Sequence, residues 1–279
     1  MRFNMKLIEY NNTATIAIYD ELVGMDDDYE RPPPSKQDNT EIREPFTNTI
    51  VTEMTDKVDE FTKEQYVLMK SVQRSKRNIL KLIRSMDLTV AYFVTLTFDK
   101  AKVDRNNYSE CCAKTRNWLQ NLRKRTGAEN MSFLCVPELH PKHMDAWHMH
   151  LIICNPGDFP ITDSGHKTNK GKTIYNADLW KYGFSTAIRI DEDPLTSIKL
   201  ARYVTKYFTK ESTMIAHNRH RFFASQNIPR PKEQIWCVRS DEERDRILSS
   251  ILNEKYQEVS ESHYDGYVGI KYIEAVSIK

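Results

Sequence analysis

Hydrophobic and polar positions recur along the chain with two different periods, and these periods predict where helices and strands lie. Apolar residues repeat every three or four positions in residues 62–86, 107–126 and 241–257, which indicates three amphipathic helices. Gly127 follows the second segment, where a glycine often ends a helix. A fourth helix is predicted from Pro194 onward, because proline is tolerated in the first turn of a helix.

Short runs rich in β-branched and aromatic residues predict the strands. Three of them are "AYFVTLTF", "MSFLCVPEL" and "WHMHLIIC", and the short link "HPKHMDA" lets the last two pair as neighbours. Residues 5–19 predict a hairpin that turns at Asn11-Asn12, and a closing strand is expected near residues 266–276. The polar residues 155–173 are expected to form a loop, followed by a short helix and a strand in "YNADLWKYGFSTAIRID". Strand pairs mixed with helices in this order indicate an α+β fold.

Length and composition agree with a globular protein of one sizeable domain or two small ones. The chain has 279 residues, of which 39% are hydrophobic and 29% charged. Residues 25–45 are acidic, rich in proline and without periodicity, and we interpret them as a linker. We therefore divide the chain into an N-terminal segment with this linker (1–60), a central domain (61–235) and a C-terminal helix with a possible strand (236–279).

The expected location is the cytoplasm, without a membrane partner. No apolar run approaches the roughly 20 residues that span a bilayer, and the N-terminus lacks the features of a signal peptide. The five cysteines include no CxxC pair, which is typical of a protein in a reducing compartment.

Charge is distributed unevenly and suggests a polyanionic partner. Residues 61–125 hold 15 Lys or Arg against 5 Asp or Glu, and residues 199–232 hold 8 against 1. Solvated helix faces would give the same pattern. The segment "GHKTNKGKT" (165–173) is similar to a phosphate-binding P-loop, but five residues rather than four separate its glycines. We interpret it as a flexible basic loop, so the chain carries no NTPase signature.

Two histidines in "WHMHLIIC" are candidates for chemistry. Side chains alternate along a strand, so His148 and His150 point the same way, and Met149, Leu151 and Ile153 point the other way. A hairpin of this strand with the preceding one would bring Glu138 to the histidines. Two imidazoles and a carboxylate suit Mn²⁺ or Mg²⁺ acting on a phosphate oxygen.

Other interpretations of the histidines stay open. They could be hydrogen-bonded core residues, and His140 or another side-chain oxygen could replace Glu138 as the third ligand. A structural zinc site that uses Cys135 or Cys154 would lack the usual paired-cysteine spacing.

The helix that begins at residue 194 carries two phenols and two ammonium groups on one face. Tyr203, Lys206, Tyr207 and Lys210 have offsets of 0, 3, 4 and 7, which place them within one narrow stripe. Nearby cations favour the phenolate, and lysines can neutralise a phosphate or a leaving oxygen. An ordinary amphipathic helix with aromatic core contacts is the alternative.

Three segments in order resemble the motifs of HUH endonucleases, the rolling-circle replication initiators of phages and plasmids. They are "FVTLTF" (93–98), "WHMHLII" (147–153) and "YVTKYFTK" (203–210). His148-Met149-His150 is similar to the family's His, hydrophobe, His motif. The doubled Y-x-x-x-Y-x-x-K is similar to the two-tyrosine class. The resemblance covers residues 90–230, and the tyrosines follow the histidines, unlike the order in conjugative relaxases.

The resemblance implies a fold, a reaction and partners. The fold would be a five-stranded antiparallel sheet with flanking helices, similar to an RNA-recognition core. Tyr203 or Tyr207 would attack single-stranded origin DNA with the help of Mn²⁺ or Mg²⁺, leaving a 5′-phosphotyrosine and a free 3′-hydroxyl. Lys206 and Lys210 would support the phosphate, and a separate host helicase and polymerase would be needed.

Two other functions are open to the same sequence. An HUH transposase or another strand-transfer enzyme would use the same chemistry for a different purpose. A non-catalytic nucleic-acid-binding module would instead hold a structural metal at its histidines, and metal removal would unfold it.

Overall fold

The computed structural model describes residues 2–24, 63–139, 146–191, 193, 195–205, 220–265 and 268–278. The chain divides into two compact units, one made of Met1–Lys70 with Pro231–Lys279 and the other of Ser71–Arg230. In chain order the elements are β1 (Arg2–Glu9), β2 (Thr13–Gly24), α2 (Lys63–Ser85), β3 (Ala91–Leu96), α3 (Tyr108–Thr126), β4 (Ser132–Leu139), β5 (Trp147–Cys154), β6 (Ile161–Lys167), β7 (Thr173–Ala177), β8 (Ser185–Arg189), α4 (Thr196–Thr205), β9 (Phe223–Ala224), β10 (Lys232–Trp236), α6 (Asp241–Glu254), β11 (Tyr256–Tyr264) and β12 (Ile270–Ser277).

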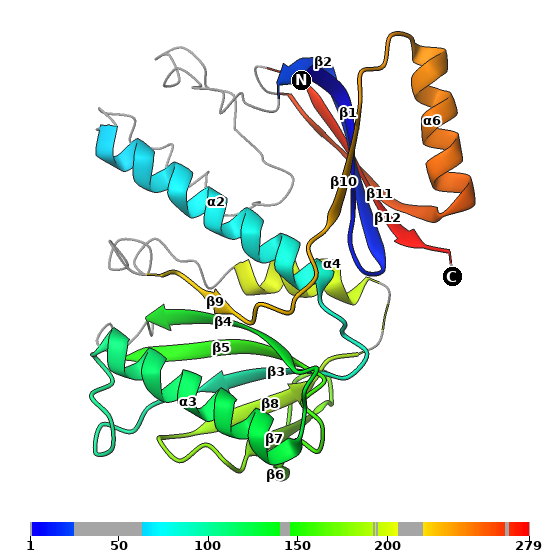
Figure 1. Cartoon of the computed structure of the whole chain (residues 1–279). Helices are drawn as coiled ribbons and strands as arrows, with labels where there is room; N and C mark the ends of the chain where they lie inside the picture. The colour runs from blue at the N-terminus through cyan, green and yellow to red at the C-terminus, as the bar shows by residue number, and fades with distance from the viewer. Residues whose placement is uncertain are drawn as a thin grey trace. The chain divides into compact units, whose positions relative to one another are not determined.

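The unit Ser71–Arg230 is built on a seven-stranded antiparallel sheet in the order β6-β7-β8-β3-β5-β4-β9 (Figure 1). Strand β5 lies between β3 and β4, with His150 opposite Thr95 on one side and Val136 on the other. The predicted pairing of the two segments joined by "HPKHMDA" is confirmed, since β4 and β5 are antiparallel neighbours.

The two faces of this sheet carry separate hydrophobic cores, as the alternation in β5 predicts. Met149, Leu151 and Ile153 are buried in a cluster with Trp118, Leu119 and Leu122 of α3. Ile152 and Cys154 face the other way and pack with Ile79 and Ile83 of α2 and with Ala201 and Val204 of α4. Figure 1 shows α3 over one face and α4 with the end of α2 over the other. The two histidines therefore lie on the face that α2 and α4 cover.

Helix α3 has both of its predicted ends. The Asn107 side chain caps the first turn by accepting a hydrogen bond from the Glu110 backbone N–H, at 3.2 Å. Gly127 ends the helix with a φ of 61°, a left-handed conformation that glycine adopts without strain, and its N–H bonds to the Arg123 carbonyl. The predicted apolar stripe is confirmed, since Tyr108, Cys111, Trp118 and Leu122 are all buried.

The unit formed by the two ends of the chain has a five-stranded antiparallel sheet in the order β10-β1-β2-β12-β11. The predicted hairpin is confirmed, with β1 and β2 joined by a turn in which the Tyr10 N–H bonds to the Thr13 carbonyl. Met5, Leu7, Ile16 and Ile273 are buried on one face against Ile251 and its neighbours in α6. The fold class is therefore α+β, as predicted, and a five-stranded antiparallel sheet is present, although the histidines lie in the seven-stranded one.

Residues 155–190 differ from the prediction. Much of the expected polar loop forms a β-hairpin, in which β6 pairs with β7 across the turn Thr168–Lys172. The expected short helix is a turn, with the Trp180 N–H bonded to the Ala177 carbonyl, before β8 begins. The pattern of hydrophobic residues does not reveal β6 and β7, because these strands lie at a solvent-exposed edge of the sheet, where polar residues are tolerated on both faces. In the described ranges, no helix is long and apolar enough to cross a membrane.

Candidate functional site

Three neighbouring strands bring Glu138, His150 and Thr95 into contact. Glu138 lies on β4, His150 on β5 and Thr95 on β3, all on the face that α2 and α4 cover. His150 Nε2 is 2.7 Å from Glu138 Oε2, and His150 Nδ1 is 3.2 Å from Thr95 Oγ1. His150 is 6% exposed and Glu138 9%. Both ring nitrogens of a buried imidazole therefore have protein partners, which fixes the orientation of the ring.

The two partners of His150 differ in what they allow the ring to do. An ionised carboxylate only accepts hydrogen bonds, so a neutral His150 donates from Nε2 to Glu138 and accepts at Nδ1 from the Thr95 hydroxyl. A hydroxyl can also accept, so the proton can move to Nδ1 and remain hydrogen-bonded to Thr95. That tautomer leaves the lone pair of Nε2 available to a metal ion.

The His150–Glu138 pair has nearly the spacing that a small divalent cation requires. Octahedral Mg²⁺ binds its ligands at about 2.1 Å, so adjacent ligand atoms are about 3.0 Å apart. The observed 2.7 Å between Nε2 and Oε2 is within a few tenths of an ångström of that value. Among the described residues there is no group of three or more His, Cys, Asp or Glu side chains that could hold a metal. A separation of 2.7 Å is also that of an ordinary charge-assisted hydrogen bond, so metal binding by this pair stays a prediction.

His148 is the third predicted ligand, and it is the cross-strand neighbour of Glu138. It lies directly opposite Glu138 in the β4–β5 ladder, so the two side chains leave the sheet on the same face. It is half-buried, whereas His150 is buried. The predicted ligands His148, His150 and Glu138 thus share one face of two adjacent strands.

The two candidate cysteines do not extend the site. Cys135 belongs to the core on the α3 side and Cys154 to the core on the other side, so they point away from each other. Burial raises the pKa of the Cys154 thiol to about 12 and raises that of Cys135 as well. Metal binding by cysteine requires the thiolate, which this burial disfavours.

Phe93 connects His150 with the candidate nucleophile Tyr203. The Phe93 ring is stacked on the His150 ring, with centroids 6.0 Å apart and an angle of 18° between the planes. The Tyr203 ring meets Phe93 edge-on at 5.4 Å. Ala201 and Val204 anchor α4 on the sheet, while Tyr203 is 45% exposed. These contacts place α4 on the same face of the sheet as the two histidines.

Part of the predicted site falls beyond the residues that the structure describes. Lys206, Tyr207 and Lys210 follow the last described residue of α4, and the alternative ligand His140 lies in the link between β4 and β5. Their roles stay predictions. Thr95 and Phe93 were not singled out from the sequence, although both lie in "FVTLTF". Their alternation in β3 with the buried Val94 and Leu96 is the signal that assigns them to the histidine face.

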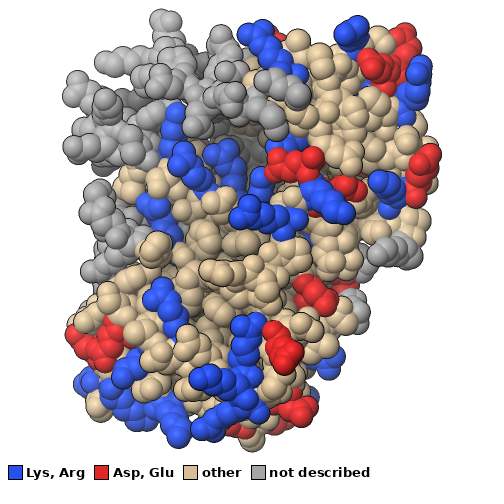
Figure 2. All heavy atoms as spheres, in the orientation of Figure 1, with Lys and Arg blue, Asp and Glu red and all other residues tan. Residues whose placement is uncertain are grey.

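Basic residues gather on the other side of this sheet as well. The exposed side chains Arg116, Arg123, Lys124 and Arg125 lie on α3, which covers the face away from the histidines. Figure 2 shows Lys and Arg concentrated at the bottom of the view, over this part of the unit. Arg123 has a structural role, because its guanidinium donates hydrogen bonds to the backbone carbonyls of Glu129 and Met131. The positive charge of α3 therefore does not converge on the histidines.

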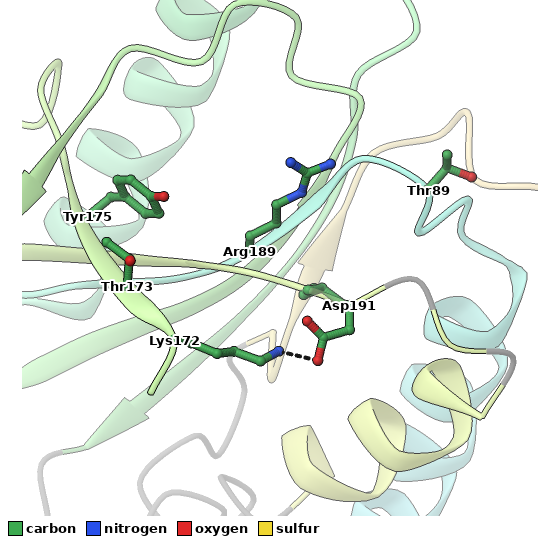
Figure 3. Close-up of a pocket in the computed structure, with 7 residues that line it drawn as sticks. Thr89, Lys172, Thr173, Tyr175, Arg189 and Asp191 are labelled. Atoms are coloured by element: carbon green, nitrogen blue, oxygen red, sulfur yellow. Dashed lines mark ion pairs between the residues drawn. The ribbon is translucent and has the colours of Figure 1, made fainter. Parts of the chain in front are cut away.

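A hollow of about 330 Å³ lies near the start of β3, away from the residue opposite His150. Figure 3 shows the side chains that line it. Its lining includes Thr89, which precedes β3, and Arg189, which pairs with Tyr92 near the start of β3. His150 instead pairs with Thr95, near the end of that strand. Lys172 is neutralised there by an ion pair of 2.5 Å with Asp191. None of the predicted catalytic or metal residues lines this hollow, so it is separate from the candidate site.

Comparison with known proteins gives one match. Residues 91–212 match the family model of the replication-associated protein ORF2. This segment is less than half of the chain, and it includes β3, β4, β5 and α4 with Glu138, His148, His150 and Tyr203. No curated protein and no solved structure matches the chain significantly. The part of the chain that holds the candidate site is thus similar to replication-associated proteins.

Proposed function

We propose that this protein is a replication initiator that nicks single-stranded origin DNA and later rejoins it. One observation carries the proposal: Glu138, His150, Phe93 and Tyr203 form a continuous set of contacts on one sheet face. The similarity of residues 91–212 to replication-associated proteins supports the same conclusion. The initiator class of enzyme needs these two components, a phosphate-polarising centre and a nucleophilic tyrosine, close together.

The reaction exchanges one phosphate ester for another. The hydroxyl oxygen of Tyr203 or Tyr207 forms a bond to the scissile phosphorus while the bond from phosphorus to the 3′-oxygen breaks. The tyrosine proton leaves to solvent, and the departing 3′-oxygen takes up a proton. The products are a 5′-phosphotyrosine and a free 3′-hydroxyl, which can prime synthesis. Because the phosphodiester energy is retained in the tyrosine link, a 3′-hydroxyl can later reverse the step and rejoin the strand.

The residues around the phosphate have separate tasks. His148, His150 and Glu138 would hold Mn²⁺ or Mg²⁺, which when bound withdraws negative charge from a phosphate oxygen. With the metal bound at Nε2, the Thr95 hydroxyl would accept a hydrogen bond from the His150 proton on Nδ1, and Phe93 stacks on the ring. These neighbours keep the donor atoms oriented before DNA arrives, so little reorganisation is needed in the transition state.

The rest of the tyrosine motif completes the cycle. Lys206 and Lys210 would neutralise charge on the phosphate and on the leaving oxygen. A second tyrosine at position i+4 can cleave the regenerated origin while the first still carries the displaced strand. Strand separation and synthesis would come from a separate helicase and polymerase of the host.

The direct test is a search for a covalent protein–DNA adduct. Single-stranded oligonucleotides that include origin-like hairpins would be incubated with Mn²⁺ or Mg²⁺ and analysed by denaturing gel and mass spectrometry. We expect an adduct on Tyr203 or Tyr207 that is lost in the double variant Tyr203→Phe/Tyr207→Phe. Tyr175→Phe is a matched control, because Tyr175 lines the hollow at the other end of the sheet.

Other outcomes would select a different function. Tight DNA binding without an adduct on any sequence would favour a non-catalytic module, and unfolding by a chelator would support it further. A strict requirement for dimerisation in cleavage would favour a transposase or another strand-transfer enzyme. An adduct in His150→Ala equal to that of the wild type would refute the site assignment.

A further inference from the structure

Phe184 is the most exposed large hydrophobic side chain in the part of the chain that the structure describes. It is 86% exposed, and the next in rank, Ile278, is 52% exposed. Burying a phenylalanine is worth about 1.5–3 kcal/mol, so leaving one in solvent forgoes that stabilisation. Single exposed apolar residues are common, and the location and rigidity of this one decide whether it has a role.

Phe184 directly precedes β8, and the register of β8 with β3 relates this segment to the face of the histidines. Thr186 lies opposite Thr95, the residue that contacts His150, and Phe184 is two residues before Thr186. Side chains two residues apart in a strand share a face. The face is covered at Ile152 and Phe93, where α4 packs, but Thr186 and Phe184 are exposed. Phe184 directly precedes Ser185, the first residue of β8, and continuing the alternation of β8 back by one residue assigns Phe184 to this open part of the candidate catalytic face.

Along the strand direction, Phe184 lies at about the same position as His148. One residue beyond the last ladder pair, Leu96–Ser185, the Thr97 N–H donates to the Phe184 carbonyl at 2.9 Å, while the Phe184 N–H bonds to the Thr97 hydroxyl. Thr97 is likewise one step beyond the pair Leu96–Met149, which brings it to the level of His148. Neighbouring strands are about 4.8 Å apart, so the backbone of Phe184 is about 10 Å from that of His148.

The backbone of Phe184 is held firmly. Its N–H donates to Thr97 Oγ1 at 3.0 Å, and that hydroxyl donates to the Phe184 carbonyl at 3.1 Å. The indole N–H of Trp180 bonds to the Thr97 carbonyl at 3.0 Å, and the Asp99 N–H bonds to the Tyr182 carbonyl at 2.7 Å. Gly183 approaches so closely that an added Cβ would lie 2.2 Å from the Thr97 carbonyl oxygen. The ring is thus presented to solvent from a rigid support.

Two lysines lie close to the segment that carries this ring, one in sequence and one through the neighbouring Tyr182. Lys181 is exposed three residues before Phe184, and Lys114 Nζ lies 5.2 Å from the centroid of the Tyr182 ring. Aromatic side chains on a rigid support with nearby lysines are typical of surfaces that bind single-stranded nucleic acid, where bases stack on the rings and cations contact the backbone. A hydrophobic protein partner would favour a wider apolar patch, and Thr186 and Lys181 interrupt it here.

We propose that Phe184 is a stacking platform for a base of the single-stranded DNA, next to the phosphate that reaches His148 and His150. This inference rests on the proposed function for the identity of the strand. It assigns Phe184 a positioning role: the stacked base sets which phosphate lies at the histidines. A rigid ring provides this contact at low entropic cost, because little mobility is lost on binding.

The test measures DNA binding separately from cleavage. The probe is a fluorescent single-stranded oligonucleotide without added metal, and the variants are Phe184→Ala, Phe184→Leu and Phe184→Trp. Loss of one base–aromatic stack should weaken binding by about 5- to 150-fold in Phe184→Ala. Phe184→Leu should lose nearly as much, because it keeps apolar volume without a ring, and Phe184→Trp should bind like the wild type. Ile278→Ala is the matched control for removal of an exposed apolar side chain.

A second readout locates the stacked base. 2-Aminopurine placed at successive positions should be quenched at one position by the wild type and Phe184→Trp, and at none by Phe184→Ala. With metal present, Phe184→Ala should raise KM or spread cleavage over neighbouring phosphates. Circular dichroism and thermal unfolding of each variant establish that it is folded.

The outcomes separate this inference from the proposed function. Phe184-dependent binding and quenching without any adduct would refute the nickase and leave the stacking platform standing. An adduct together with unchanged binding and quenching in Phe184→Ala would overturn the platform and leave the nickase. Absence of single-strand binding in the wild type would overturn the platform, as would a Phe184→Leu variant that binds fully.

Discussion

Replacing Thr95 with valine removes one hydroxyl from the candidate site and keeps the shape of the side chain. The hydroxyl is 3.2 Å from His150 Nδ1, and His150 is only 6% exposed, so water does not readily replace the lost partner. An unsatisfied buried polar atom costs about 1–2 kcal/mol. In a unit of this size the melting temperature should fall by about 2–8 °C.

The same substitution should weaken metal binding more than it weakens the fold. The substitution removes the hydroxyl that would accept a hydrogen bond from Nδ1–H, which disfavours the tautomer whose Nε2 can act as a ligand. Loss of such an orienting partner typically costs 10- to 100-fold in metal affinity or activity, which corresponds to about 1.4–2.7 kcal/mol. We expect the Mn²⁺ concentration for half-maximal adduct formation to rise by that factor.

The assay compares Thr95→Val with the wild type and with Thr115→Val. Thr115 is fully buried on α3, and its hydroxyl bonds to the Cys111 carbonyl at 2.9 Å, away from the histidines. Both variants should lower the melting temperature, and only Thr95→Val should change Mn²⁺ binding by calorimetry and the metal titration of the adduct. If Thr95→Val bound Mn²⁺ as tightly as the wild type, the orienting role of Thr95 would be refuted.

Three further predictions concern the fold. Gly183→Ala should destabilise the protein by about 1–3 kcal/mol in urea unfolding, because its Cβ would meet the Thr97 carbonyl oxygen at 2.2 Å. Hydrogen bonds from Thr89 hold the pKa of Asp87 below its usual 3.8, so its contribution to stability is complete above pH 3.8 and is lost as the pH falls through the lowered value. Because Asp87 is exposed and water screens its hydrogen bonds, Asp87→Ala should cost at most about 0.5 kcal/mol at pH 7 and nothing at the acid end of the urea series. Cys237 is the one exposed thiol of five, so it alone should react quickly with a thiol reagent at pH 8, and all five should react in denaturant.

Local pattern was sufficient for elements whose residues interact with their neighbours in sequence. Helix α3 follows from the spacing of its apolar residues, the Asn107 cap and Gly127, all of which act within one or two turns. The alternation in β5 likewise predicted that His148 and His150 share a face, because the side-chain period of a strand is a property of its backbone. The β6–β7 hairpin was missed, since an exposed edge strand has no hydrophobic alternation to reveal it.

The site required distances that no local pattern contains. The sequence suggested Glu138 as a ligand only on the assumption that β4 and β5 pair, and the register then set which atoms meet: Glu138 contacts His150 diagonally and lies opposite His148. Thr95 and Phe93 reach the histidine from a strand more than fifty residues earlier. Such contacts depend on strand order, which the sequence does not state.

The sequence by itself determined the α+β class, most of the helices, the common face of the two histidines and the resemblance of the motifs. These features follow from short-range periodicity and from residue types. Only the tertiary structure decided that the two ends of the chain share one five-stranded sheet, that Thr95 and Phe93 contact His150, and that Phe184 is exposed to solvent just before β8. Each of these arises from pairing between strands far apart in the chain, where many alternative registers satisfy the same hydrophobic pattern and the packing of the whole sheet selects one.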